Sequence, residues 1–510
     1  MRQARGVPSL ILAIDAGTTG ITALVVDAAA EVVARGYREF PQYYPADGQV
    51  EHDLGEMWSA TLTAVREALD ALDVSGRGTR ADLVAIGVTN QRETLCLWDR
   101  ETLGSPRRAI VWQDRRSAGI CRRLEEAGHL PLVHRRTGLR LDPYFTATKA
   151  MWVRESEPQA WHSVVTGSTA LGTVDSYLVA RMSRGVDHVT DATNASRTLL
   201  CDLSTGTWDP DLCEVFGVPM EALPRIVPSY CLPGQVPLAQ SDPSAFLGLD
   251  LPITGIAGDQ QAALVGQAGI APGDAKCTYG TGSFLLLHTG SSPVMSEHGL
   301  LTTIALRHPD GRIDYALEGA VFVTGSAVQW LRDGLGIITT AAEVEPLARS
   351  VDDSGGVVFV PALTGLGAPH WDPDARGTII GITRGTTKAH IARATLEAIA
   401  FQVADVTSLM ERESGVDLAT LCIDGGAAGN DLLCQLQADA IGRRVDRSAE
   451  LQTTGLGAAF LAGVGSGVWG SLGDLRAARR SSGTFAPGLR DEAGLENWHR
   501  AVRRSEQWAH

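Results

Sequence analysis

The sequence predicts an α/β protein built from two domains. Apolar, β-branched runs alternate with stretches whose apolar residues have helical spacing, which is typical of this class. Two separate segments, 10–27 and 275–288, each combine a strand, a tight Gly-Thr loop and a second strand. A chain of 510 residues also has room for two to four domains of about 150 residues each.

Composition and charge narrow the class of protein. A hydrophobic content of 44% with 20% charged residues is typical of a globular chain with a sizeable core. The formal net charge of -15 argues against a nucleic acid or an anionic membrane surface as the main partner. No apolar run approaches the ~20 residues of a membrane helix, and the cysteines lack CxxC spacing. We therefore expect a cytoplasmic protein with no stable membrane insertion.

The first element is the segment LILAIDAGTTGITALVVD, residues 10–27, which predicts two buried strands and a tight loop. The glycines let backbone N–H groups approach an anion, and the hydroxyls of Thr18 and Thr19 add donors. The carboxylate of Asp15, at the end of a buried strand, needs a positively charged partner. A hydrated Mg²⁺ bound to a nucleotide phosphate is such a partner. The alternative is that Asp15 only caps its own turn.

The next elements are a helix over 55–72 and a strand over 83–90 that ends in the polar cluster NQRET. Arg92 and Glu93 stand side by side in this cluster. In a cleft, the pair would hold two vicinal hydroxyls. On a surface it would be an ion pair worth about 0–1 kcal/mol.

A second acid, Asp259, follows a strand and opens a helix in ITGIAGDQQAALVGQ. It is either a helix N-cap or a reacting carboxylate, and Gln260 and Gln261 beside it can bind hydroxyls. Three aromatic side chains, Trp112, Tyr144 and Phe284, either pack in the core or stack on the C–H face of a small polyol.

Gly269, Pro272 and Gly273 predict a junction before a strand at 275–279 and the second Gly-Thr loop. We expect domains over 1–269 and 270–510, each with one phosphate hairpin, as a weak internal repeat. Chance recurrence among 56 glycines is the alternative. The charged tail over 476–510, with Trp498 and Trp508, predicts a docked surface helix.

Taken together and in order, a dozen segments resemble the FGGY carbohydrate kinases, and within that family the members that phosphorylate glycerol. The resemblance runs from about residue 9 to 505 and implies two actin-like, ribonuclease-H-like ATPase domains flanking a catalytic cleft. Among the segments are DAGTT (15–19), GVTNQRET (87–94), GIAGDQQAALVGQ (255–267), TYGTGSF (278–284) and IDGGAAGND (423–431).

The resemblance implies ATP and Mg²⁺ as cofactors, glycerol as the acceptor, sn-glycerol 3-phosphate as the product, and a homodimer or homotetramer. Asp259 matches the general base, and Asp15 and Asp259 match the metal-binding carboxylates. Glycerol would be bound by Arg92, Glu93, Trp112, Tyr144, Asp259, Gln260 and Phe284. The nucleotide would be bound by Gly17, Thr18, Thr19, Gly280, Thr281, Gly325, Gln329, Gly426 and Asn430.

The chain departs from the family in the first hairpin, where Ala16 and Thr22 replace the usual Gln and Arg. The second change removes a cation near the γ-phosphate. The stretch 231–251 has no Lys, Arg or His, so control by fructose 1,6-bisphosphate or by histidine phosphorylation is not expected there. Two alternatives stay open: a kinase for another small polyol or dihydroxyacetone, and a catalytically weak regulatory protein that binds ATP or a polyol.

Overall fold

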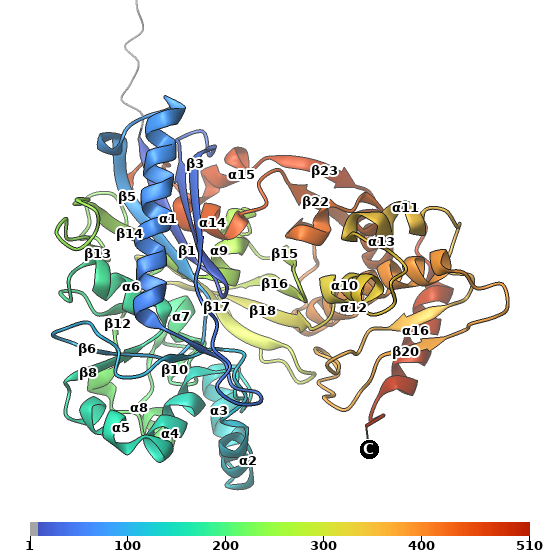
Figure 1. The fold of residues 1–510 in the computed structure, drawn as a ribbon, viewed down its shortest axis with the longest axis horizontal. Helices are drawn as coiled ribbons and strands as arrows, with labels where there is room; N and C mark the ends of the chain where they lie inside the picture. The colour runs from blue at the N-terminus through green and yellow to red at the C-terminus, as the bar shows by residue number, and fades with distance from the viewer. Residues whose placement is uncertain (1–8, 510) are drawn as a thin grey trace, which may run out of the picture.

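The computed structural model describes residues 9–509 and divides into two lobes, each built on one mixed β-sheet (Figure 1). The α/β class expected from the sequence is therefore confirmed. The first sheet, in spatial order, contains β13 (Ala239–Gln240), β14 (Pro252–Gly258), β5 (Leu83–Asn90), β1 (Leu10–Ala16), β2 (Gly20–Val26) and β3 (Val32–Glu39).

The second sheet repeats the arrangement of the first. In both, a central strand has an antiparallel hairpin partner on one side and a parallel strand on the other: β1 between β2 and β5, and β15 between β16 and β21. The two Gly-Thr loops thus occupy equivalent places, which confirms the internal repeat. In spatial order the strands are β17 (Leu301–Arg307), β18 (Ile313–Val321), β16 (Ser283–Gly290), β15 (Asp274–Tyr279), β21 (Thr420–Asp424), β22 (Arg444–Ser448) and β23 (Ser481–Phe485).

Two long helices pack on the first sheet. Helix α1 (Leu54–Ser75) begins after Asp53, whose side chain accepts hydrogen bonds from the amides of Gly55 and Glu56, and it packs on β2 and β3. Helix α14 (Thr453–Ser466) comes from the C-terminal part of the chain but packs on β1, β5 and β14. The C-terminal part of the chain therefore completes the core of the first lobe.

Glycines let α14 approach its neighbours closely. A Cβ atom at Gly87 of β5 would lie 2.1 Å from the carbonyl oxygen of Ala458. A Cβ at Gly457 would lie 1.8 Å from the carbonyl oxygen of Ala262 in α9 (Asp259–Gly266). Because α9 begins at Asp259, this close packing fixes the helix that carries a candidate site residue.

Helices α2 to α8 lie in the insertions of the first lobe, and α10 to α13 cover the second sheet (Figure 1). Their bounds are α2 (Ala118–Glu126), α3 (Leu130–Thr137), α4 (Thr146–Ser156), α5 (Pro158–Val165), α6 (Val174–Met182), α7 (Ala192–Ala195), α8 (Pro210–Phe216), α10 (Gly325–Asp333), α11 (Val344–Ala348), α12 (Lys388–Ser414) and α13 (Asp431–Ile441). Within residues 9–509, no helix combines the length and the apolar character needed to cross a bilayer.

The C-terminal tail docks through one tryptophan. Helix α16 (Glu492–Ser505) buries Trp498, whose indole N–H donates to Asp405 at 2.7 Å. Trp508 lies beyond the end of the helix and is 68% exposed. The expectation that both tryptophans mark one docked helix is therefore wrong for Trp508, because the helix ends at Ser505.

Candidate active site

The first Gly-Thr loop lies at the tip of the β1–β2 hairpin and is held by side chains from three other segments. The carbonyl oxygens of Gly17 and Thr18 accept hydrogen bonds from the amides of Gln91 (3.1 Å) and Gln42 (2.9 Å). The indole N–H of Trp112 donates to the Thr18 hydroxyl at 3.0 Å. Trp112, expected on the polyol side, thus directly contacts the first Gly-Thr loop.

Asp15 is a carboxylate in need of a cation. Burial, with a smaller contribution from the negative charge of Asp259, raises its pKa to about 7. Within residues 9–509, none donates a hydrogen bond to its carboxylate, so the interpretation of Asp15 as a turn cap is wrong. Asp15, near the end of β1, and Asp259, directly after β14, repel each other. Two such carboxylates are a donor set that suits Mg²⁺, which prefers carboxylate oxygens.

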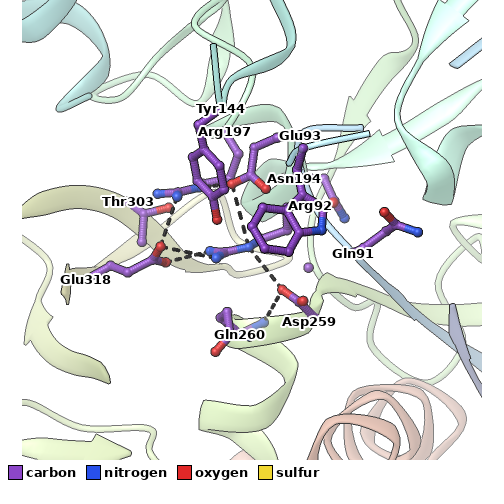
Figure 2. A network of polar contacts seen from close by, with 12 residues as sticks. Gln91, Arg92, Glu93, Tyr144, Asn194, Arg197, Asp259, Gln260, Thr303 and Glu318 are labelled. Carbon is purple, nitrogen blue, oxygen red and sulfur yellow. Dashed lines mark hydrogen bonds and ion pairs between the residues drawn. The ribbon is translucent and has the colours of Figure 1, made fainter. Parts of the chain in front are cut away.

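The Arg92 guanidinium is the centre of a buried network of charges (Figure 2). It contacts Asp259 through Nε at 3.0 Å and Glu318 through Nη1 at 2.6 Å and Nη2 at 3.2 Å. Its Nη1 also donates to Gln261 at 3.2 Å. Since Arg92 and Glu93 are both buried and their nearest charged atoms are 3.8 Å apart, the surface ion pair is the wrong interpretation.

Glu93 and Tyr144 are fixed by cations behind them. Arg197 donates from Nε to Glu93 Oε1 at 2.7 Å, and its guanidinium lies 5.8 Å from the centre of the Tyr144 ring. The buried ammonium of Lys149 donates to the backbone carbonyls of Tyr144 (2.6 Å) and Glu93 (3.4 Å). The Tyr144 and Trp112 rings meet edge to face at 5.5 Å. The two aromatic residues and Glu93 therefore form one fixed wall.

Asp259 is the first residue of α9, and only one of its two carboxylate oxygens, Oδ1, is held by neighbouring groups. Its Oδ1 accepts from the backbone amide of Gln260 at 2.7 Å and contacts Arg92 Nε. Gly258 is the N-cap of α9, so the N-cap interpretation of Asp259 is wrong. Among the described residues, none donates to Oδ2, and the side chain is 28% exposed. Its Oδ2 is therefore available to a bound molecule.

The second Gly-Thr loop packs against the start of α10. The amide of Gly325 donates to the carbonyl of Gly280 at 3.0 Å, and the amide of Ser326 donates to that of Thr281 at 3.1 Å. A Cβ at Gly325 would lie 2.6 Å from the Gly280 carbonyl oxygen, so a larger residue does not fit. Gly280, Thr281 and Gly325 therefore form one local structure.

The other predicted nucleotide residues border this structure. Gly426 is exposed in the turn after β21, and the side chain of Asn430 accepts from the amide of Leu433 and caps α13. Gln329 is exposed on α10, one turn after Gly325. In the described part of the chain, no contact joins these three residues to the Arg92 network. The structure thus gathers the predicted residues in two groups, one on each lobe.

Phe284 belongs to the face of the second sheet that meets the first lobe. It stands opposite Ala320 on β18, two residues from Glu318, and alternate residues of a strand share a face. On β15, Lys276 and Thr278 share this face, and the Lys276 ammonium donates to the side-chain oxygen of Gln260. Phe284 and Gln260 therefore border the same region between the lobes.

Sequence reasoning named Gln261 as a hydroxyl-binding side chain, whereas the structure places it against Arg92. It missed four other residues of this network: Glu318, Arg197, Lys149 and Lys276. A signal was present for two of them. Glu318 in DYALEGAV and Lys276 in DAKCTYG are charges in the interior of largely apolar strands, and the other charge of each strand, Asp314 or Asp274, lies at or next to its first residue. A buried charge needs a partner, so each indicates a polar contact without saying which residue makes it.

Comparison with known families agrees with this architecture. Residues 10–266 match the N-terminal domain of the FGGY family of carbohydrate kinases, and residues 275–466 match the C-terminal domain of that family. The chain is 50% identical over 504 residues to the glycerol kinase of Trichlorobacter lovleyi, covering 98% of this chain and 99% of that protein. It is 49% identical over 502 residues to the glycerol kinase of Dechloromonas aromatica, covering 98% of both.

Solved structures give the same result for the fold. The crystal structure of Plasmodium falciparum glycerol kinase with ADP superposes with a TM-score of 0.90 at 33% identity, covering 99% of both chains. The gluconate kinase of Lactobacillus acidophilus superposes with a TM-score of 0.84 at 22% identity, covering 98% of this chain and 97% of that one. The latter shows similarity of fold alone. The expected two-domain architecture is confirmed over the whole length.

Proposed function

Because the chain belongs to the FGGY family of carbohydrate kinases, we propose that it transfers the γ-phosphoryl group of ATP to glycerol, giving sn-glycerol 3-phosphate. Full-length relatives that are named glycerol kinase support this reaction. The observation in the structure that carries the proposal is the orientation of Asp259. One of its oxygens is held by Arg92 and by a backbone amide, and the other is free.

Asp259 is proposed as the general base. As the primary hydroxyl oxygen of glycerol bonds to the γ-phosphorus, its proton passes to Asp259 Oδ2 and the bond from phosphorus to the ADP oxygen breaks. Phosphoryl transfer depends mainly on positioning and on stabilising negative charge. Arg92 and the Gln260 amide hold Oδ1, so Oδ2 keeps one direction toward the acceptor.

The polyol is recognised by groups that remain available in the network. Arg92 keeps one N–H on Nη2 that has no partner among residues 9–509, and no described residue donates to Glu93 Oε2. These two groups are proposed to bind neighbouring hydroxyls, with Gln260 as a third contact. The rings of Trp112, Tyr144 and Phe284 would pack against the C–H groups. A site built for hydroxyls rejects acceptors that lack them, by about 10⁴-fold in other enzymes.

The nucleotide is proposed to bind across the two hairpins. Gly17, Thr18 and Thr19 on one side and Gly280, Thr281 and Gly325 on the other would hold phosphates, while Gln329, Gly426 and Asn430 would contact adenosine. Mg²⁺, held by Asp15 and Asp259, would neutralise phosphate charge. At the position of the missing arginine, Thr22 is 7% exposed and pairs with Asp15 across the hairpin. The buried Lys276 beside Gln260 supplies a cation near Asp259.

Three further expectations remain proposals. The division of the chain at 269/270 is supported by the two sheets, although α14 packs back on the first. A homodimer or homotetramer is proposed from the family resemblance, and light scattering on the purified protein measures it. A cytoplasmic location is proposed from composition and charge.

The activity is tested by measuring ADP release with Mg²⁺–ATP and glycerol, dihydroxyacetone, erythritol, xylulose or no acceptor. We expect turnover with glycerol, and its loss when Mg²⁺ is chelated. Asp259→Asn should lower kcat by about 10²–10⁴-fold and leave the Kd for ADP within about threefold. Asp250→Asn, at an exposed acid outside the network, is the matched control.

The outcomes separate the alternatives. Turnover with another acceptor alone would keep the reaction class and change the substrate. Nucleotide binding without turnover on any acceptor would favour the regulatory protein. Substantial activity of Asp259→Asn would remove Asp259 as the base.

A further inference from the structure

A carboxylate from the second lobe completes the charge network of the first. Glu318 lies on β18, is 1% exposed, and binds two arginines that both come from the N-terminal half of the chain. Arg92 contacts it through both Nη atoms, and Arg197 donates from Nη2 to Oε1 at 2.9 Å. Figure 2 shows Glu318 on one side of Arg92 and Asp259 on the other.

Glu318 is charged in this setting. Burial alone would raise the pKa of its carboxyl group, but the positive charges of Arg197 and Arg92 outweigh burial and lower it to about 2. Removing the charge of Glu318 would leave the buried positive charges of Arg92 and Arg197 with less negative charge nearby. The two arginines would then face only Glu93 and Asp259.

The position of Arg92 depends on Glu318 in particular. Of the five N–H groups of Arg92, three donate to Glu318 and Gln261 and one points to Asp259. Glu318 attracts the Arg92 guanidinium in one direction, and Asp259 and Glu93 attract it in another. Without Glu318, Arg92 would shift toward Asp259 and Glu93, the groups that must meet the polyol.

The strand that carries Glu318 continues to the nucleotide side. At its end, Val321 pairs with Ser283, next to the Gly280-Thr281 loop. Three residues later, the Thr324 hydroxyl hydrogen-bonds that of Ser283 at 2.7 Å, and the Thr324 amide donates to the Thr281 carbonyl. A movement of this sheet relative to the first lobe therefore moves Glu318 and the second hairpin together.

We propose that Glu318 is a positioning residue for the polyol, supplied by the nucleotide-binding lobe, so that Arg92 is aligned only when the two lobes are together. This rests on the proposed function of the site. Polyol and nucleotide binding are then coupled through the Glu318–Arg92 contact, and the coupling is reciprocal. Glu318 contacts neither substrate; it acts through Arg92 and Arg197.

The test uses Glu318→Gln, which keeps the shape of the side chain and removes its charge. We expect the glycerol KM to rise at least about tenfold and the ATP KM to stay within about twofold. Calorimetric titration with glycerol, with and without a non-hydrolysable ATP analogue, measures the coupling. In the wild type the analogue should tighten glycerol binding about fivefold or more, and in Glu318→Gln less than about twofold.

Two further variants separate positioning from a general structural effect. Glu397→Gln removes another partly buried acid of the second lobe, which pairs with Arg393 at 2.7 Å far from the network, and should leave both KM values unchanged. Glu318→Asp keeps the charge but shortens the side chain, so it should raise the glycerol KM by about threefold to tenfold. If Glu318→Gln does not fold, Glu318→Asp is the variant used to test the proposal.

An equal rise in both KM values, or unchanged coupling in a folded Glu318 variant, would overturn the proposal. Failure of the proposed function looks different. In that case the wild type itself shows no turnover with glycerol, and the same titrations are made with whichever polyol binds. The coupling between polyol and nucleotide binding then tests the positioning role of Glu318, whichever polyol is the acceptor.

Discussion

Lys149 is a buried ammonium whose hydrogen bonds all end on backbone carbonyls. It donates to the carbonyls of Glu93 and Tyr144, which belong to one wall of the proposed polyol site, and also to the carbonyl of Phe145 at 3.1 Å. Burial lowers its pKa to about 7. In the unfolded chain a lysine keeps its proton to about pH 10.4. Between these values the unfolded state binds more protons, so the contribution of Lys149 to stability rises with pH.

We therefore expect Lys149→Met to change stability in a pH-dependent way. Below pH 7 the wild type carries the full cost of a buried charge, which methionine avoids, and above pH 7 this cost declines. The free energy of unfolding of the variant minus that of the wild type should fall by about 2–3 kcal/mol from pH 7 to pH 9. Urea unfolding at several pH values measures it.

The exposed Lys388→Met serves as the control and should show no such trend. The same Lys149 variant should raise the glycerol KM more than the ATP KM, because the carbonyls that it loses belong to Glu93 and Tyr144. A stability difference that stays constant from pH 6 to pH 9 would contradict the assignment of the buried charge.

At the scale of single residues, sequence reasoning found the site residues at the ends of strands. It missed the buried charged residues that hold these side chains in place. Asp15, Arg92 and Asp259 each follow a readable apolar run, so their place at an element end was predictable. The contact of Arg92 with Glu318 joins residues 226 positions apart, and one sequence contains no measure of that proximity. Lys149 lies within a helix, where a lysine is most often solvated.

At the scale of elements, the two hairpins were predictable because each is local. Strands β1 and β2 pair directly through a short loop, as do β15 and β16. The place of α14 was not predictable, since an apolar helix can cover either sheet with equal hydrophobic gain. The sequence alone does not show that the glycines of α14 permit close packing, because the neighbouring backbone comes from distant parts of the chain.

Gly457 is the position where α14 approaches α9 most closely, with a hypothetical Cβ 1.8 Å from the Ala262 carbonyl oxygen. Gly457→Ala should force the helices apart and lower the free energy of unfolding by about 1–3 kcal/mol. Because Asp259 opens α9, kcat should fall as well. Denaturant unfolding and steady-state kinetics measure the two effects.

Gly119→Ala in α2 is the matched control, since its Cβ would meet only Arg122 Nη2 at 4.0 Å. Alanine there should be neutral or stabilise the helix by up to about 1 kcal/mol. If Gly457→Ala were as stable and as active as the control, close packing of α14 on α9 would not position Asp259.

At the scale of the whole molecule, the formal net charge of -15 opposes the approach of an anionic nucleotide and leaves an uncharged polyol unaffected. Long-range repulsion is screened by salt, with a Debye length of about 8 Å at 0.15 M, whereas contacts inside the site are screened much less. In the proposed function, ATP is therefore bound by short-range contacts at the two hairpins, against the repulsion of the net negative charge.

Raising the ionic strength from about 20 mM to about 150 mM at constant free Mg²⁺ should thus lower the ATP KM by about twofold to fivefold. The glycerol KM should not change, and it is the internal control because glycerol carries no charge. Steady-state kinetics in sodium chloride and in potassium acetate separate screening from binding of a particular ion. An ATP KM that rises with salt would show that cations near the hairpins, Lys276 among them, outweigh the charge of the whole chain.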